Sequence, residues 1–149
     1  MTKTELLTKT ELFERWCDEV WRKGNLDAID DFLKTSTLTA GVVPHMQMGP
    51  ADFRELVTVV RFHVGPIEPT IQHCVEQGDW LAVMMQFDST RADNGAPIQV
   101  PGQVFLRFEG DKMVEAYNLL DFMSFFEQLG LLPPDALTIC LTGHKLDWS

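Results

Sequence analysis

The sequence has 149 residues, a formal net charge of −10 and a pI near 4.7. The acidic balance argues against nucleic acid and anionic membranes as partners, because both bind to basic patches. Hydrophobic residues make up 45% and charged residues 23%, which is typical of one globular domain over residues 1–149. No apolar run approaches the about 18 residues of a membrane span, and the N-terminus is too polar for a secretory leader, so we expect a cytoplasmic protein.

Cysteine and histidine spacing predicts neither a disulfide framework nor a metal site. The three cysteines are scattered without a C-x-x-C spacing, and the four histidines are dispersed without an H-E-x-x-H spacing. The sequence has no G-x-G-x-x-G or P-loop for a nucleotide and no G-x-S-x-G for a nucleophile. We therefore expect no metal and no cofactor, which leaves cofactor-free proton transfer or simple binding.

The N-terminal region predicts two helices after a lead-in over residues 1–9. Thr8 and Glu11 have capping-box spacing, and apolar residues then recur at helical spacing until Gly24 ends the first helix. Asn25 can cap a second helix. The apolar face of that second helix would consist of Leu26, Ile29, Phe32 and Leu33.

Aromatic residues on the predicted helices suit the core or the wall of a pocket. On the first helix these are Trp16 and Trp21, for which stacking on a ligand is the alternative role. A strand and loop follow over residues 35–49, and a third helix is predicted over residues 51–64 with Phe53 turned inward. Apolar residues alternate along that strand: Leu38, Ala40 and Val42.

Two β-hairpins are predicted in the second half of the chain. The first joins strands at residues 70–75 and 80–90, and the second joins strands at residues 98–108 and 113–120. The strand at residues 80–90 is fairly apolar on both of its alternating sides, so we expect the sheet to be covered on two faces. The helices would cover one face, and a second copy of the chain in a homodimer would cover the other.

An acid among apolar residues stands at the end of the last predicted strand. Asp121 has apolar neighbours on both sides, so its side chain points to water, pairs with a donor or sits in a pocket. In a pocket, desolvation disfavours the charged form of a carboxyl group, which suits proton transfer. The alternative is that Asp121 caps a helix that begins at Phe122. If Asn118 and Asp121 both line a pocket, a bulge or the strand end must lie between them.

Residues 115–121 read Glu-Ala-Tyr-Asn-Leu-Leu-Asp and are followed by Gln-Leu-Gly at residues 128–130. This ending resembles that of the SnoaL-like polyketide cyclase family, in the nuclear-transport-factor-2-like superfamily that also holds the ketosteroid isomerases. The resemblance covers roughly residues 11–133 and leaves residues 134–149 as a C-terminal extension. It implies an α+β fold in which a curved, mixed or antiparallel sheet wraps as a cone-shaped barrel on about three N-terminal helices.

The resemblance implies that Asp121 is the acid/base for an intramolecular aldol ring closure or a proton shift. The substrate would be a small hydrophobic carbonyl compound in an enclosed pocket, which the chain would bind without a cofactor. The stretch where the family often carries a histidine, residues 89–93, has none here. The expected substrate-binding residues, which include the candidate donors to an enolate oxygen, are Trp16, His45, Phe53, His63, Gln103, Tyr117 and Asn118.

Two other functions stay open at this point. The fold hosts unrelated functions, so a non-catalytic domain for small-molecule binding or dimerisation is the alternative. A hydratase-like or dehydratase-like enzyme would need two opposed acid/base groups, which Asp121 with His45 or His63 could supply.

Overall fold

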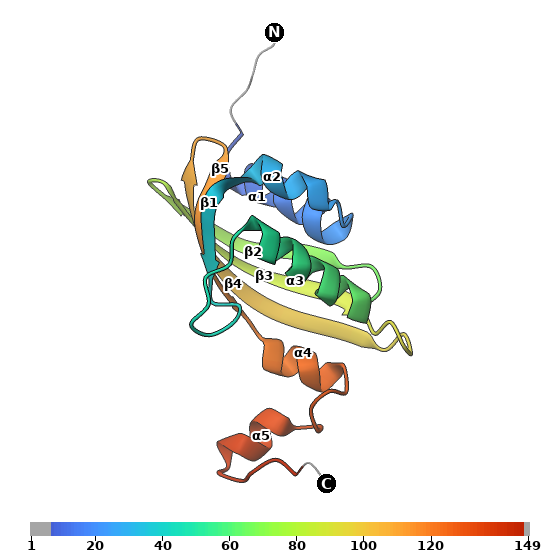
Figure 1. Ribbon diagram of the computed structural model, residues 1–149. Coiled ribbons are helices and arrows are strands. Elements are labelled where there is room, and N and C mark those ends of the chain that lie inside the picture. The colour runs from blue at the N-terminus through green and yellow to red at the C-terminus, as the bar shows by residue number, and fades with distance from the viewer. Residues whose placement is uncertain (1–6, 148–149) are drawn as a thin grey trace.

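The computed structural model describes residues 7–147 and forms a five-stranded sheet with helices (Figure 1). Residues 1–6, which hold most of the expected lead-in, and residues 148–149 lie outside the described part. The helical elements are the α-helix α1 (Lys9–Trp16), the π-helix η1 (Cys17–Arg22), the 3₁₀-helix η2 (Leu26–Ala28) and the α-helices α2 (Ile29–Phe32), α3 (Pro50–His63), α4 (Phe122–Gln128) and α5 (Ala136–Leu141). The strands are β1 (Leu33–Ala40), β2 (Glu68–Gln77), β3 (Trp80–Thr90), β4 (Pro97–Glu109) and β5 (Lys112–Leu120).

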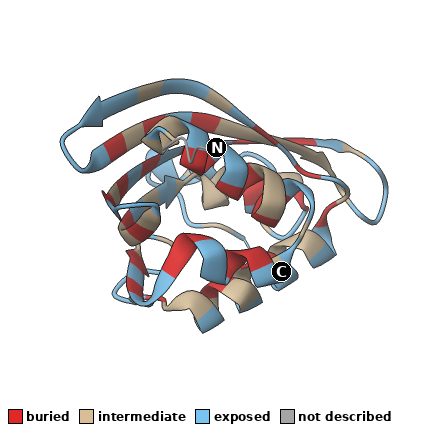
Figure 2. Cartoon of the chain, turned by 90° about the horizontal axis from the view of Figure 1, so that it is seen from above, coloured by how far each residue is buried: buried red, intermediate tan, exposed pale blue. Residues whose placement is uncertain are grey.

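The sheet is mixed, with the strand order β1-β5-β4-β3-β2. β1 pairs parallel with β5, and the other neighbours pair antiparallel. Helices α1, α2 and α3 lie on one face of this curved sheet (Figure 1), and the buried stretches lie mainly where helices and sheet face each other (Figure 2). The predicted α+β class, with a curved sheet on N-terminal helices, is confirmed. We call the face away from these helices the outer face.

The first helix begins with its cap at Thr8 and ends at Gly24 as predicted, but its second half is a π-helix. Thr8 and Glu11 form the capping box: the Glu11 N–H donates to the Thr8 hydroxyl at 3.1 Å, and the Thr8 N–H donates to the Glu11 carboxylate at 2.9 Å. From Cys17 the helix widens into a π-helix. Gly24 ends it with φ +71°, and the Arg61 guanidinium donates to the carbonyl of Trp21 at 2.6 Å.

The expected second helix is shorter than predicted. It consists of the single 3₁₀ turn of η2 and the four residues of α2, and Leu33 already begins β1. The Asn25 side chain does not cap it but donates to the Glu19 carboxylate at 3.2 Å. The helix stops because Leu33 pairs with Met113 of β5, so tertiary strand pairing overrides the helical spacing.

Strand β1 turns Thr37 and Thr39, and not Leu38, toward the helices. Thr37 and Thr39 are 1% and 3% exposed, whereas Leu38 is 46% exposed on the outer face. The Thr37 hydroxyl donates to the carbonyl of Met113 at 2.8 Å, which compensates for its burial. The apolar alternation of this strand therefore marks its outer side.

The two hairpins form close to the predicted bounds. Leu81, Val83 and Met85 of β3 point into the core, as the alternation predicts. A bulge in β2 between Ile71 and His73 shifts the register, so that His73 pairs with Met84 and lies on the outer face. Only the pairing with β3 reveals this shift, because the sequence of β2 alternates smoothly.

Helix α4 is attached to the end of β4, beyond the point where β5 stops. The Gln128 side chain accepts from the backbone N–H of Gln99 and donates to its carbonyl, both at 2.8 Å. One side chain thus provides the two hydrogen bonds that a neighbouring strand would otherwise make. Helix α5 packs against α4, where the backbone N–H of Leu137 donates to the Glu127 carboxylate at 2.7 Å.

Candidate functional site

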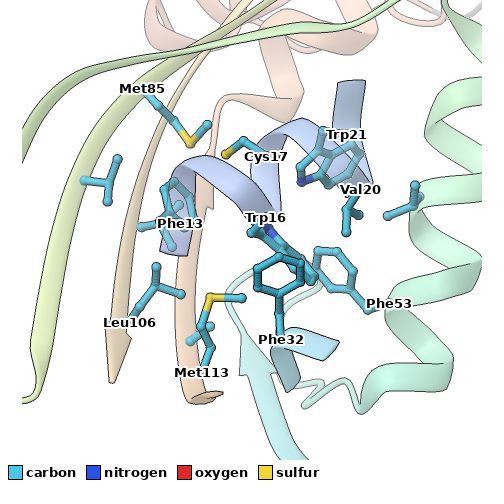
Figure 3. Close-up of a cluster of buried hydrophobic side chains, with 14 of the residues drawn as sticks. Phe13, Trp16, Cys17, Val20, Trp21, Phe32, Phe53, Met85, Leu106 and Met113 are labelled. Atoms are coloured by element: carbon cyan, nitrogen blue, oxygen red, sulfur yellow. The ribbon is translucent and has the colours of Figure 1, made fainter. Parts of the chain in front are cut away.

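An inner cavity of about 40 Å³ lies between the helices and the sheet, beside the aromatic cluster of Figure 3. Its wall includes three of the predicted substrate-binding residues, namely Trp16, Phe53 and Asn118. The ring centroids of Trp16 and Phe53 are 5.2 Å apart. The fold therefore brings these three together, from the first helix, the third helix and the last strand.

The π-helix explains how both tryptophans of the first helix reach this cavity. In a continuous α-helix, residues five apart point about 140° away from each other. In η1 the turn is wider, with the N–H of Lys23 donating to the carbonyl of Asp18, five residues earlier, at 3.0 Å. Trp21 thus shares a face with Trp16, and both rings contact Phe53. Helical spacing alone does not predict this widening.

A second cavity of about 50 Å³, the mouth cavity, lies toward the end of α3 and the start of α4. Three residues line both cavities and form a partition between them: Trp21, Phe87 and Leu120. The rings of Trp21 and Phe87 meet edge to face with their centroids 5.6 Å apart. An apolar cavity of about 150 Å³ takes up benzene. Neither cavity alone nor the two together reach that size, so an aromatic ligand fits only if side chains of the partition move and enlarge the space.

The inner cavity is apolar apart from a few hydrogen-bonding groups. Thr39, Asn118 and the two indole rings supply these groups, and the Asn118 amide donates to the carbonyl of Ala40 at 3.4 Å. Among the described residues that line either cavity, none carries an ionisable side chain. Any acid/base group must therefore come from the edge of the cavities.

Asp121 follows the end of β5, is half-buried and is not among the residues that line either cavity. It stands between Leu120, which lines both cavities, and Phe122, which lines the mouth cavity. Its Oδ1 accepts from the backbone N–H of Ser124 at 3.0 Å and caps α4. The cap interpretation is confirmed, and β5 ends at Leu120, between Asn118 and Asp121. The acid/base role of Asp121 stays a prediction.

The other predicted residues lie away from the inner cavity. Tyr117 and Gln103 are on the outer face, because they alternate with the inward-facing Asn118 and Val104 across the β4–β5 ladder. His45 is exposed in the loop after β1 with φ +63°, and His63 is exposed at the end of α3. The fold thus separates these residues from Asn118.

Tyr117 belongs to a charged network on the outer face. Its hydroxyl donates to the Glu115 carboxylate, which also accepts from the guanidinium of Arg107. The hydrogen bond from Tyr117, followed by that from Arg107, lowers the pKa of Glu115. The same bond to Glu115 raises the pKa of Tyr117.

The cysteines offer no reactive thiol to the inner cavity. Burial raises the pKa of Cys17 to about 12, so its thiol stays protonated at neutral pH. Within residues 7–147 no group of three or more His, Cys, Asp or Glu side chains could hold a metal ion. No helix in this described range is long and apolar enough to cross a membrane.

The profile of the SnoaL-like polyketide cyclase family matches residues 11–129. Among curated proteins, none matches the sequence. Solved structures are similar in fold. A protein from Acidithiobacillus ferrooxidans that is assigned as a polyketide cyclase has a TM-score of 0.70 at 19% identity, covering 88% of this chain and 99% of its own.

Two further structures carry the same fold. IdmH from Streptomyces antibioticus, also assigned as a polyketide cyclase, has a TM-score of 0.71 at 16% identity and covers 83% of this chain and 99% of its own. A Catenulispora acidiphila protein with a ketosteroid isomerase-like fold, in complex with trimethylamine, has a TM-score of 0.71 at 19% identity. The match covers 86% of this chain and 98% of that protein. The fold is thus the predicted one, that of the nuclear transport factor 2 and ketosteroid isomerase type.

Proposed function

Because the chain belongs to the SnoaL-like polyketide cyclase family, we propose that it catalyses cofactor-independent acid/base chemistry on a small hydrophobic carbonyl compound. The reaction would be a ring closure of the aldol type or a proton shift. The observation that carries the proposal is the position of Asp121. Asp121 stands in the chain between Leu120 and Phe122, which line two apolar cavities whose own lining has no ionisable side chain among the described residues.

In the proposed ring closure, Asp121 acts first as a base and then as an acid. Its carboxylate removes a proton from the carbon next to a carbonyl group and leaves an enolate. The enolate carbon attacks a second carbonyl of the same molecule, a carbon–carbon bond forms, and the resulting alkoxide takes the proton back from Asp121. Asn118 would donate to the enolate oxygen from the cavity wall. In a water-poor cavity such a donor stabilises developing charge strongly.

The test is isotope exchange, which needs no knowledge of the natural substrate. An enzyme of this type exchanges the protons next to a ketone for deuterium in D₂O, and NMR follows this in a series of small cyclic and aromatic ketones. We expect Asp121→Asn to slow the exchange by about 10²–10⁴-fold. Asparagine caps helices as well as aspartate does, so this variant keeps the fold. Equal exchange in both proteins would contradict the mechanism.

A non-catalytic binding domain is the second candidate, and two observations favour it. Asp121 is already used in the cap of α4, and both cavities are small. A binding domain would take up ketones without exchanging their protons. Ketone binding that is equal in wild type and Asp121→Asn, with no exchange in either, would support this candidate over the enzyme.

We also propose that a second copy of the chain covers the outer face. The outer sides of β3, β4 and β5 form cross-strand rows with exposed apolar side chains. In the rows through Ala82 and Met84 there is no charged side chain, and in the row through Trp80 the charges of Arg107 and Glu115 pair with each other. The large exposed apolar residues there are Leu38, Val75, Trp80, Met84, Phe105, Tyr117 and Leu119.

Charge favours a copy of the same chain at this face. Two chains of net charge −10 repel each other. They can approach most easily through the outer face, because Arg107 and Glu115 there pair within one chain and no like charges have to meet. We expect sedimentation velocity to show a dimer and Phe105→Lys to yield a monomer. The matched control is Phe62→Lys, since Phe62 is 80% exposed on α3 and should leave the dimer intact. A monomeric wild type would contradict the proposal.

A further inference from the structure

Three buried hydrogen-bonding side chains, Thr39, Trp16 and Trp21, line the inner cavity without a side-chain hydrogen bond among the described residues. Thr39 is 3% exposed and Trp21 is 7% exposed, and both line this cavity. In the part of the chain that the structure describes, neither the Thr39 hydroxyl nor the Trp21 indole N–H makes a hydrogen bond. Among the described residues, every side-chain nitrogen or oxygen atom that is fully enclosed has a hydrogen-bond partner. Both polar atoms therefore border free space.

The neighbouring Thr37 shows what a structural threonine looks like on the same strand. It lies two residues earlier on the same side of β1 and is 1% exposed. Its hydroxyl donates to the carbonyl of Met113 and accepts from the N–H of Lys34, both at 2.8 Å. Thr39 lies in the regular part of the ladder, opposite Ala116, and its hydroxyl has no such partners. A valine at position 39 would fill the same volume and avoid the cost of burying an unpaired hydroxyl.

The Thr39 hydroxyl and the Trp21 indole N–H have complementary chemistry. An indole N–H can only donate, and a hydroxyl can donate or accept. Around them the wall is apolar, with Phe53 and Met85 among its members. In Figure 3 the indole nitrogen of Trp21 lies on the edge of the ring turned toward Cys17 and Met85. The arrangement fits one acceptor oxygen carried on an apolar molecule.

We infer that Thr39 and Trp21 form a subsite for the oxygen of the ligand's carbonyl group on the wall of the inner cavity. The inference rests on the proposed carbonyl ligand and adds two residues to the proposed site. About 40 Å³ holds the oxygen end only, so the apolar remainder of the ligand extends past Phe87 and Leu120 into the mouth cavity. When an enolate forms, the oxygen becomes more negative, and both donors bind it more strongly than the carbonyl.

Because the partition separates the cavities, binding must displace at least one of its side chains. Phe87 contacts Trp21 edge to face, so a shift of Phe87 joins the two cavities while the Trp21 N–H stays in place. The ligand class is thus an apolar ring compound that carries a carbonyl oxygen at its edge.

The test compares a ketone with the hydrocarbon of the same shape, 1-indanone with indane, by NMR titration of the full chain. Thr39→Val removes the hydroxyl and keeps the volume, so we expect the affinity for indanone relative to indane to fall about three- to tenfold. Trp21→Phe removes the N–H and should lower the same ratio. The matched control is Thr37→Val, which should lower the unfolding temperature but leave the ratio unchanged.

Each outcome decides the inference. It is overturned if the wild type binds no indanone, if Thr39→Val leaves the ratio unchanged, or if Thr37→Val lowers the ratio equally. It is also overturned if Thr39→Val loses as much thermal stability as Thr37→Val, because Thr39 would then have a structural partner. If the affinity ratio depends on Thr39 but the isotope exchange does not depend on Asp121, the subsite is supported and the catalytic proposal is refuted. If the exchange depends on Asp121 but the ratio does not depend on Thr39, only the subsite is refuted.

Discussion

Asp121 has two roles to separate, the cap of α4 and proton transfer, and substitution by alanine or asparagine separates them. Alanine removes the Oδ1 that accepts from Ser124 at 3.0 Å, and loss of an N-cap costs about 1 kcal/mol, within about 0.5–2 kcal/mol. Asparagine keeps an acceptor and loses only the interaction of the negative charge with the helix dipole, about 0.3–1 kcal/mol. We therefore expect Asp121→Ala to be the less stable of the two variants.

The measurement is thermal and urea unfolding followed by circular dichroism at neutral pH. In a chain of this size about 1 kcal/mol shifts the unfolding temperature by about 2–4 °C. Asp121→Ala should show that shift, and Asp121→Asn a smaller one that shrinks with added salt. If both variants match the wild type, the cap contributes nothing. If asparagine is as damaging as alanine, the charge and not the cap geometry stabilises α4, and the isotope-exchange comparison loses its control.

Three further predictions concern the scaffold. Gln128→Ala should cost about 1–2 kcal/mol in urea unfolding, because it removes both hydrogen bonds to Gln99, while a neutral result would show that α4 is held by apolar contacts. Gly24→Ala should cost about 1–2 kcal/mol, since φ is +71° and the new Cβ would lie 2.6 Å from the Arg61 guanidinium. The pKa of Glu115 is lowered on folding, so its contribution to stability is present above the ordinary value of 4.5 and is lost as the pH falls below it. We therefore expect the free energy of unfolding of Glu115→Gln to depend less on pH in the acid range than that of the wild type.

The sequence by itself determined the features that depend on near neighbours in the chain. Thr8 and Glu11 are three residues apart and cap the first helix, and Asp121 caps α4 through the same kind of local bond. The hairpins follow from alternation and turn residues, because side chains on a strand must point to opposite faces. The family motif at the end of the chain could likewise be recognised from the sequence.

Only the tertiary structure decided which of these residues meet. The widening of the helix at Cys17 turns Trp21 to the same cavity as Trp16, and no pattern of single residues predicts it. Pairing of β1 with β5 turns Thr39 inward and Leu38 outward, against the apolar alternation. Burial and strand register depend on contacts between segments that are distant in the chain. The spacing of residues within one segment does not tell which other segment packs beside a side chain, or whether that space stays empty.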